Sequence, residues 1–258
     1  MGILNITPDS FSDGGLYYPL DKALFHAERL IQEGADIIDI GGESTRPGAE
    51  SVSLQTELDR VMPVIEALRR EFPILLSIDT QKPAVMEAAI KIGINIVNDI
   101  FALQAEGALE IIANSDVAIC LMHMQGKPKT MQNKVFEGDI IQEVKQFFDK
   151  RINACVNAGI DKKRIIIDPG FGFGKSIHDN LILIRDLALL NENNLPLLVG
   201  VSRKSTIGAI IDAAPQDRLY GSLAMETLAI VNGAHIIRAH DIKPTVDAIK
   251  ITHAVLHS

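Results

Sequence analysis

The sequence predicts an α/β fold, a single (β/α)8 TIM barrel that occupies residues 1–258 as one domain. Three observations predict it: short apolar runs recur along the chain, amphipathic helical patterns separate them, and the runs end on polar residues. The runs are continuously apolar, which is typical of parallel strands buried on both faces. The expected strands are Gly2–Ile6, Asp36–Ile40, Ile74–Ile78, Ile94–Val97, Val117–Met122, Ile165–Ile167, Leu197–Val201 and His235–Ile237.

Three segments between these strands carry the clearest helical spacing of apolar residues. They are Asp21–Glu33, Thr56–Arg70 and Ile140–Ile152. An open, doubly wound sheet is the alternative architecture, and it needs a glycine-rich turn at the start of the first helix. Thr7–Ser10 is not such a turn, so the barrel is favoured. No composition shift or Pro/Ser-rich linker indicates a second domain.

Composition narrows the class of partner. A net charge of −8 argues against nucleic acid or an anionic membrane as the main partner. No apolar stretch approaches the roughly 20 residues of a membrane span, and no leader segment is visible. Cys120 and Cys155 are too few for a disulfide scaffold, lack the spacing of a metal site, and are expected in the core. A reduced, cytoplasmic compartment is therefore expected.

Polar residues follow nearly every expected strand. In a barrel, the carboxyl ends of all strands meet at one rim, where barrel enzymes place their active sites. One such residue alone is equally consistent with a helix cap, but their repetition favours a shared polar site. The residues are Asn5, Asp39, Asp79, Asn98, His123, Asp168, Lys204, Arg238 and His240.

Two kinds of chemistry are expected at this rim. Asn5 offers a neutral oxygen to Mg²⁺, which usually takes one or two protein oxygens and completes its shell with phosphate and water. Carboxylates and an amide suit a flat, nitrogen-rich ring, because a carboxylate accepts parallel N–H bonds. The residues of this second kind are Asp79, Asn98 and Asp168. The cations expected to hold an anion are Arg46, Lys204, Arg238 and His240.

Simpler interpretations exist for single residues. Asp79 is consistent with a cap for the helix that begins near Pro83, and Asp168 with a turn residue. Lys204 is consistent with a solvated lysine or with the Schiff-base lysine of an aldolase-like barrel. The neighbouring Arg203 indicates a polar, wet environment, which argues against the aldolase because that chemistry needs a desolvated lysine.

The stretch Gly170–Ser176 imitates a phosphate-binding loop, but its glycine spacing does not match. The glycines are interpreted as letting the backbone approach a flat ligand, with Phe171 or Phe173 as an apolar wall. His123 is expected to be a hydrogen-bonding residue at a strand end rather than a metal ligand.

Seven stretches together resemble the dihydropteroate synthase family, and the resemblance spans nearly the whole chain. It implies a pterin-binding (β/α)8 barrel of folate biosynthesis. Such enzymes condense 6-hydroxymethyl-7,8-dihydropterin diphosphate with 4-aminobenzoate to give 7,8-dihydropteroate and diphosphate, and sulfonamides target them. The stretches are Met1–Gly15, Gly41–Gly48, Ser77–Thr80, Asn98–Ile100, Asp168–Lys175, Ser202–Ser205 and Arg238–Asp241.

The resemblance also implies roles residue by residue. The pterin-binding positions are Asp79, Asn98, Ile100, Met122, Asp168, Gly200 and Lys204. The diphosphate-binding positions are Asn5, Arg238 and His240, and Asn5 is also the Mg²⁺ ligand. The aminobenzoate-binding positions are Thr45, Arg46, Pro47, Phe173, Ser202 and Ser205. A first mobile loop contains Phe11, Ser12 and Asp13.

The implied catalytic set is Asp79, Asp168, Lys204, Arg238, His240 and Asp13, with Mg²⁺ as cofactor. An SN1-like course is implied, in which Mg²⁺ assists diphosphate departure and the aspartates stabilise the resulting pterin cation. The resemblance also implies a homodimer through the late helices. Family members usually carry a further segment ahead of the first strand, often a hairpin that closes the barrel floor.

Two rival functions share the expected pterin pocket. A corrinoid-linked methyltransferase that uses methyltetrahydrofolate has no use for Arg46 or for a diphosphate site. A non-catalytic pterin-binding homologue would have lost one of the loop residues, and none is lost. Diphosphate release that depends on 4-aminobenzoate and Mg²⁺ separates the three.

Overall fold

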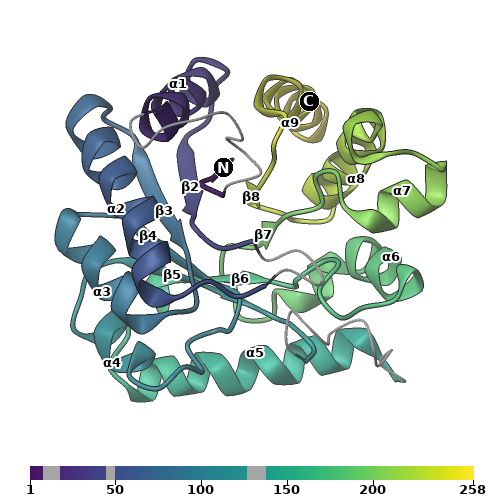
Figure 1. The fold of residues 1–258 in the computed structure, drawn as a ribbon. Coiled ribbons are helices and arrows are strands. Elements are labelled where there is room, and N and C mark those ends of the chain that lie inside the picture. Colours follow the sequence, from purple (N-terminus) through teal and green to yellow (C-terminus); the bar gives the residue numbers. More distant parts are fainter. Residues whose placement is uncertain (8–17, 45–49, 127–137) are drawn as a thin grey trace.

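In the computed structural model, residues 1–7, 18–44, 50–126 and 138–258 are described. Strands and helices alternate along them, with the strands at the centre and the helices around them (Figure 1). The strands are β1 (Gly2–Asn5), β2 (Ile37–Gly41), β3 (Leu75–Asp79), β4 (Ile96–Asp99), β5 (Ala118–Met122), β6 (Ile165–Asp168), β7 (Leu198–Val199) and β8 (Ile236–Ile237). The α-helices are α1 (Tyr18–Gln32), α2 (Leu54–Glu71), α3 (Pro83–Ile92), α4 (Ala108–Ala113), α5 (Ile140–Asn157), α6 (Ile177–Arg185), α7 (Ser205–Ile211), α8 (Leu219–Val231) and α9 (Ile242–Leu256).

Parallel pairing closes the strands into a barrel. Strands β1 to β6 pair side by side in chain order, and β7 pairs with β8. Two single parallel bridges join these sheets, Ile167 to Leu197 and Gly2 to Ala239. Ile3 N donates to Ala239 O at 3.1 Å and so ties β1 to the chain after β8. The predicted α/β barrel is confirmed.

The strand boundaries differ from the prediction mainly at the last two strands. The sequence predicts Leu197–Val201 and His235–Ile237, whereas β7 and β8 contain two residues each. Val201 is buried, but Lys204 N donates to Val201 O at 3.2 Å. That bond forms a turn, so the extended backbone of β7 ends before Val201.

The sequence supplies side-chain caps where several helices begin. Ser53 caps α2, Asp139 caps α5, and Ser176 exchanges hydrogen bonds with Asp179 at the start of α6. The three predicted helices are confirmed, with boundaries shifted by a few residues. Within the described segments, no helix is long and apolar enough to cross a membrane.

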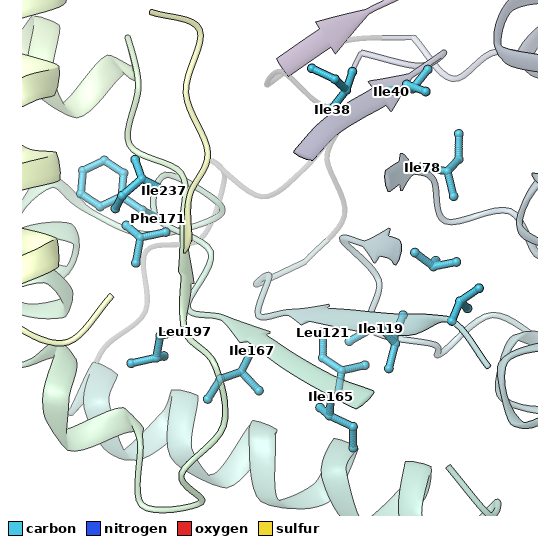
Figure 2. Packing of buried hydrophobic residues seen from close by; sticks show 14 of the residues in the cluster. Ile38, Ile40, Ile78, Ile119, Leu121, Ile165, Ile167, Phe171, Leu197 and Ile237 are labelled. Carbon is cyan, nitrogen blue, oxygen red and sulfur yellow. The ribbon is translucent and has the colours of Figure 1, made fainter. Parts of the chain in front are cut away.

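The core has two parts, one on each side of the sheet. The larger part lies between the strands and the helices and includes Ile38, Ile40 and Ile78 (Figure 2). Side chains alternate along a strand, so Ile37 and Asp39 face the inside of the barrel. The inside therefore changes from apolar to polar toward the carboxyl ends of the strands. The smaller, inner part contains Met1, Ile37, Ile96, Cys120, Ile166 and Leu198.

Candidate active site

A buried network of charged and amide groups joins four strands at the polar end of the barrel. Arg238 Nε donates to Asp39 Oδ2 at 2.6 Å, and Arg238 Nη2 donates to Asp79 Oδ2 at 2.8 Å. Asn98 Nδ2 donates to the same Asp39 Oδ2 at 3.1 Å. Asp39 is fully buried, and Asp79 and Asn98 are nearly so. The structure therefore brings the predicted pterin and diphosphate residues into contact.

Burial and charge act in opposite directions on this network. Burial raises the pKa of Asp79 to about 7, although Arg238 opposes the rise and Asp39 adds to it. Burial alone lowers the pKa of Arg238, but the carboxylates of Asp39 and Asp79 outweigh it and raise that pKa overall. Arg238 is therefore a permanent cation, whereas Asp79 titrates near neutrality.

Three buried acceptors in this region have no hydrogen-bond partner among the described residues. They are Asp39 Oδ1, Ser77 Oγ and Asp79 Oδ1. A buried, unsatisfied polar atom is costly, and such atoms collect where a ligand or water completes them. The acceptors lie on neighbouring strands, because Asp39 pairs in register with Ser77.

The simpler interpretation fails for Asp79 and holds in part for Asp168. Asp79 does not cap α3, whose N-terminal cap residue is Lys82 without a side-chain bond. Asp168 does act as a turn residue, because its Oδ1 accepts from Gly170 N at 2.7 Å. Its carboxylate is buried and also interacts with Lys204, because burial raises the pKa of Asp168 while the charge of Lys204 lowers it.

Lys204 is not in the wet environment predicted for it. Its ammonium donates to Phe171 O and lies 4.6 Å from the centroid of the Phe173 ring. Burial lowers the pKa of Lys204 to about 8, with Asp168 opposing the fall. The prediction was wrong because Arg203 adopts a φ of 57° and pairs with Asp241 instead of surrounding Lys204 with polar groups.

The glycines of residues 170–174 make room for the protein's own backbone at two of three positions. A Cβ on Gly170 would lie 1.8 Å from His123 O, and one on Gly174 would lie 2.6 Å from Gln125 O. Only Gly172 lies against a site residue, where a Cβ would approach Lys204 Cδ to 3.1 Å. All three have φ between 67° and 83°, so backbone conformation and close packing already require glycine here, and the approach of a flat ligand to this loop stays a prediction.

Lys175 is a buried cation that sequence reasoning assigned to no role. Its Nζ donates to the carbonyl oxygens of Gly170 (2.9 Å), His123 (3.2 Å) and Phe173 (3.2 Å). Burial lowers the pKa of Lys175 to about 7. In the sequence it appears only as part of the stretches Asp168–Lys175 and Gly170–Ser176, without a role of its own. In the structure, the hydrogen bonds of Lys175 connect the backbone after β5 to the backbone after β6.

His123 takes part in this connection through its backbone oxygen, which accepts from Lys175. The ring of His123 packs edge-on against Phe147 at 4.9 Å between centroids, and burial lowers the pKa of His123 to about 2. Its Nδ1 has no hydrogen-bond partner within the described residues. The hydrogen bonds expected of His123 at the strand end come from its backbone, whose N donates to Asp168 O at 2.9 Å and whose O accepts from Lys175.

The loops after β7 and β8 meet through Ser202 and His240. His240 N donates to Ser202 Oγ at 3.2 Å, and His240 Nδ1 lies 3.1 Å from the same oxygen. Ser205 is exposed at the start of α7, and Phe173 is half-buried. The structure thus joins a predicted diphosphate residue to a predicted aminobenzoate residue.

The remaining predicted residues line the same end of the barrel. Met122 pairs in register with Asp168, and a Cβ on Gly200 would lie 3.7 Å from Arg238 Cβ. A Cβ on Gly41 would lie 3.5 Å from Asn5 Oδ1. Ile100 is buried in the turn after β4.

Six predicted residues lie outside the described residues. They are Phe11, Ser12, Asp13, Thr45, Arg46 and Pro47.

A second buried carboxylate borders the site on the side of α2. Glu57 accepts from Thr80 Oγ1 at 2.6 Å and from Lys82 Nζ at 2.5 Å. Lys82 also bonds Glu43, at the end of the segment after β2. A cavity beside them is lined by Glu43, Ser44, Glu57, Asp79, Thr80, Gln81 and Ile100. Sequence reasoning missed this group because nothing in the helical pattern of α2 marks Glu57 as buried.

A parallel barrel whose strand ends gather carboxylates, an amide and two cations is a scaffold for an enzyme acting on a small molecule. The chain belongs to the family of pterin-binding enzymes, whose model matches residues 1–240. Within that family it belongs with the dihydropteroate synthases.

Three relatives carry this placement. The dihydropteroate synthase of Escherichia coli (strain K12) is 51% identical over 256 residues, which cover 99% of this chain and 91% of that protein. The Yersinia pestis enzyme in a sulfonamide drug complex superposes with a TM-score of 0.95 at 51% identity, over 100% of this chain and 94% of the other. The Xanthomonas albilineans enzyme in complex with 7,8-dihydropteroate gives a TM-score of 0.90 at 44% identity, over 100% and 93%.

Proposed function

We propose that this chain condenses 6-hydroxymethyl-7,8-dihydropterin diphosphate with 4-aminobenzoate to give 7,8-dihydropteroate and diphosphate. The observation that carries the proposal is the 2.8 Å ion pair between Arg238 and Asp79, which joins the expected leaving-group cation to the expected pterin carboxylate. The complex of the Xanthomonas albilineans relative with 7,8-dihydropteroate supports the same product.

The pterin is proposed to bind among Asp79, Asn98, Asp168 and Lys204. Asp79 Oδ1 is a buried acceptor without a partner among the described residues, which suits a ring N–H. The ammonium of Lys204 suits a ring oxygen or nitrogen that accepts a hydrogen bond. Ile100, Met122 and Gly200 are proposed to line the pocket.

Bond breaking is proposed to precede bond formation. The C–O bond between the pterin methylene and the diphosphate breaks, and the electron pair leaves with the diphosphate. Arg238 and His240 stabilise that anion, while Asp79 and Asp168 face the positive charge left on the pterin. The arylamine nitrogen then forms the C–N bond and loses a proton to solvent. Asp13, outside the described residues, is proposed to position the amine.

Mg²⁺ is proposed as the cofactor, and the donor set fits it. Asn5 Oδ1 lies at the carboxyl end of β1, within 3.5 Å of the position that a Cβ on Gly41 would take. Hard oxygen donors of this kind suit Mg²⁺, which leaves most of its shell to phosphate and water. Bound there, the ion would neutralise charge on the diphosphate oxygens.

The aminobenzoate is proposed to bind at Phe173, Ser202 and Ser205, together with Thr45–Pro47 outside the described residues. We further propose that sulfonamides occupy this position. The complex of the Yersinia pestis relative with a sulfonamide drug supports this assignment.

We also propose that the chain acts as one barrel domain, as a homodimer, in the cytoplasm. Apolar side chains exposed on the late helices support the dimer. They are Tyr220, Leu228 and Val231 on α8 and Ile251 and Val255 on α9. Helices α8 and α9 pack against each other, so both can contribute to one surface.

Diphosphate release from the pterin diphosphate tests the proposal. We expect release only when 4-aminobenzoate and Mg²⁺ are both present, and loss of release on chelation. Methyl transfer from methyltetrahydrofolate to a corrinoid would instead support the rival methyltransferase. Pterin binding without either reaction would support a non-catalytic homologue. A further test is Asp168→Asn or Lys204→Ala, since unchanged affinity for the pterin diphosphate by calorimetry would overturn the pocket assignment.

A further inference from the structure

The buried amide of Asn180 on α6 contacts both elements that enclose Lys204. Asn180 Oδ1 accepts from Gly172 N at 2.7 Å, and Asn180 Nδ2 donates to Thr206 Oγ1 at 3.1 Å and to Lys175 O at 3.4 Å. Asn180 is 1% exposed and Thr206 is 4% exposed. One amide therefore binds residues 170–175 on one side and α7 on the other.

These two elements fix Lys204 from opposite directions. Lys204 immediately precedes α7, so Thr206 holds the backbone from which Lys204 projects. Gly172 lies against the Lys204 stem, because a Cβ there would be 3.1 Å from Lys204 Cδ. Phe171 O accepts from the ammonium. Displacing either element would move the ammonium relative to Asp168.

We propose that Asn180 is a positioning residue for the transfer reaction, acting with Thr206 to hold Lys204 and Ser205 at a fixed distance from Asp168 and Phe173. This inference rests on the proposed function, in which these residues contact the pterin and the aminobenzoate. Asn180 itself touches neither substrate. Its own position is set by α6, whose first turn is fixed by the mutual hydrogen bonds of Ser176 and Asp179.

A hydroxyl series at Thr206 separates positioning from mere folding. Thr206→Val keeps the shape and removes the acceptor for Asn180, while Thr206→Ser keeps the acceptor. Thr252→Val is the matched control, because Thr252 is 6% exposed and its hydroxyl donates within α9, to Ala248 O at 2.8 Å, with no other bond to the described residues. Asn180→Ala removes all three bonds at once.

The readouts are the affinity for the pterin diphosphate by calorimetry, the KM for 4-aminobenzoate and kcat, with thermal denaturation of each variant. We expect Asn180→Ala and Thr206→Val to weaken pterin affinity and kcat/KM by about tenfold, as a small displacement of aligned groups does. Thr206→Ser and Thr252→Val should stay within about twofold of the parent chain.

The kinetics of the Thr206 variants can overturn the positioning role of Asn180. Kinetics of Thr206→Val that match Thr252→Val at equal stability would overturn the inference, as would a Thr206→Ser variant as impaired as Thr206→Val. If Asn180→Ala does not fold, the Thr206 pair still decides. Absence of diphosphate release by the parent chain would refute the proposed function instead, and pterin affinity would still report on positioning.

Discussion

Arg238, directly after β8, and Asp39 of β2 are joined inside the barrel by a 2.6 Å hydrogen-bonded ion pair, between residues 199 positions apart in the chain. Asp39 Oδ2 also accepts from Asn98, so one buried oxygen sets the spacing of two site residues. This contact determines how the site responds to substitution.

Replacing Arg238 tests the network directly. Arg238→Gln leaves Asp39 and Asp79 without their cation, and removing one partner of a buried pair costs about 3–5 kcal/mol. We expect that loss of unfolding free energy in urea titrations, together with a loss of pterin diphosphate affinity. Arg185→Gln is the control, because Arg185 pairs with Asp186 on the surface. Equal effects of the two substitutions would contradict the role given to the buried network.

Pterin affinity should depend on the protonation of Lys204. Because the pKa of Lys204 is lowered to about 8, its positive charge is lost as pH rises through that value. We expect the dissociation constant of the pterin diphosphate to rise between pH 8 and pH 9.5. Lys204→Arg should remove most of this rise, because arginine keeps its positive charge throughout this pH range. If the dissociation constant rises equally with pH in both proteins, a group other than Lys204 titrates.

Glycine substitutions should separate close approach from backbone strain. Gly170→Ala forces a Cβ to within 1.8 Å of His123 O at a φ of 67°, so the loop must move. We expect a loss of about 3 kcal/mol or more in unfolding free energy. Gly93→Ala is the control, since its φ is 100° but nothing lies within 4 Å. It should cost only about 1 kcal/mol. Similar losses would mean that strain alone decides.

Glu226 should make stability depend on pH. It is buried on α8 and accepts from Thr245 Oγ1 of α9 at 2.8 Å, and burial raises its pKa from 4.5 to about 7. The folded state then holds the proton more tightly than the unfolded state, so stability falls as pH rises from about 4.5 to 7.

Glutamine does not titrate in this range, so the variant Glu226→Gln lacks this pH dependence. Relative to the parent chain, it should gain on the order of 2 kcal/mol of unfolding free energy between pH 5 and pH 8. Urea denaturation at both pH values measures the change, with Glu28→Gln on the exposed face of α1 as control. A constant difference between Glu226→Gln and the parent chain would contradict the prediction.

The barrel was predictable because its signals are local and repeated. Continuous apolar runs such as Ile165–Ile167 indicate buried parallel strands, and the polar residue after each run indicates the rim. The rim positions of Asp79, Asn98 and Asp168 were predicted in this way, and the structure joins Asp79 and Asn98 through Arg238 and Asp39.

What the sequence did not predict depends on distant parts of the chain. Asp39 stands within an apolar run, and only barrel closure places Arg238 beside it. The desolvation of Lys204 depends on Phe171 and on the diversion of Arg203 toward Asp241. Such contacts have no periodicity, so composition and spacing carry no trace of them.

The shared oxygen of Asp39 has a consequence for drug resistance. An inhibitor that contacts Asp79, Asn98 and Arg238 rests on side chains that satisfy one another inside the barrel. A substitution of one of these residues that prevents inhibitor binding would leave a buried charge or amide unpaired. Few folded proteins tolerate the resulting loss of stability. Ser205, exposed at the start of α7, carries no such penalty. Resistance should therefore arise more readily against compounds bound at Ser205 than against compounds bound at the buried network.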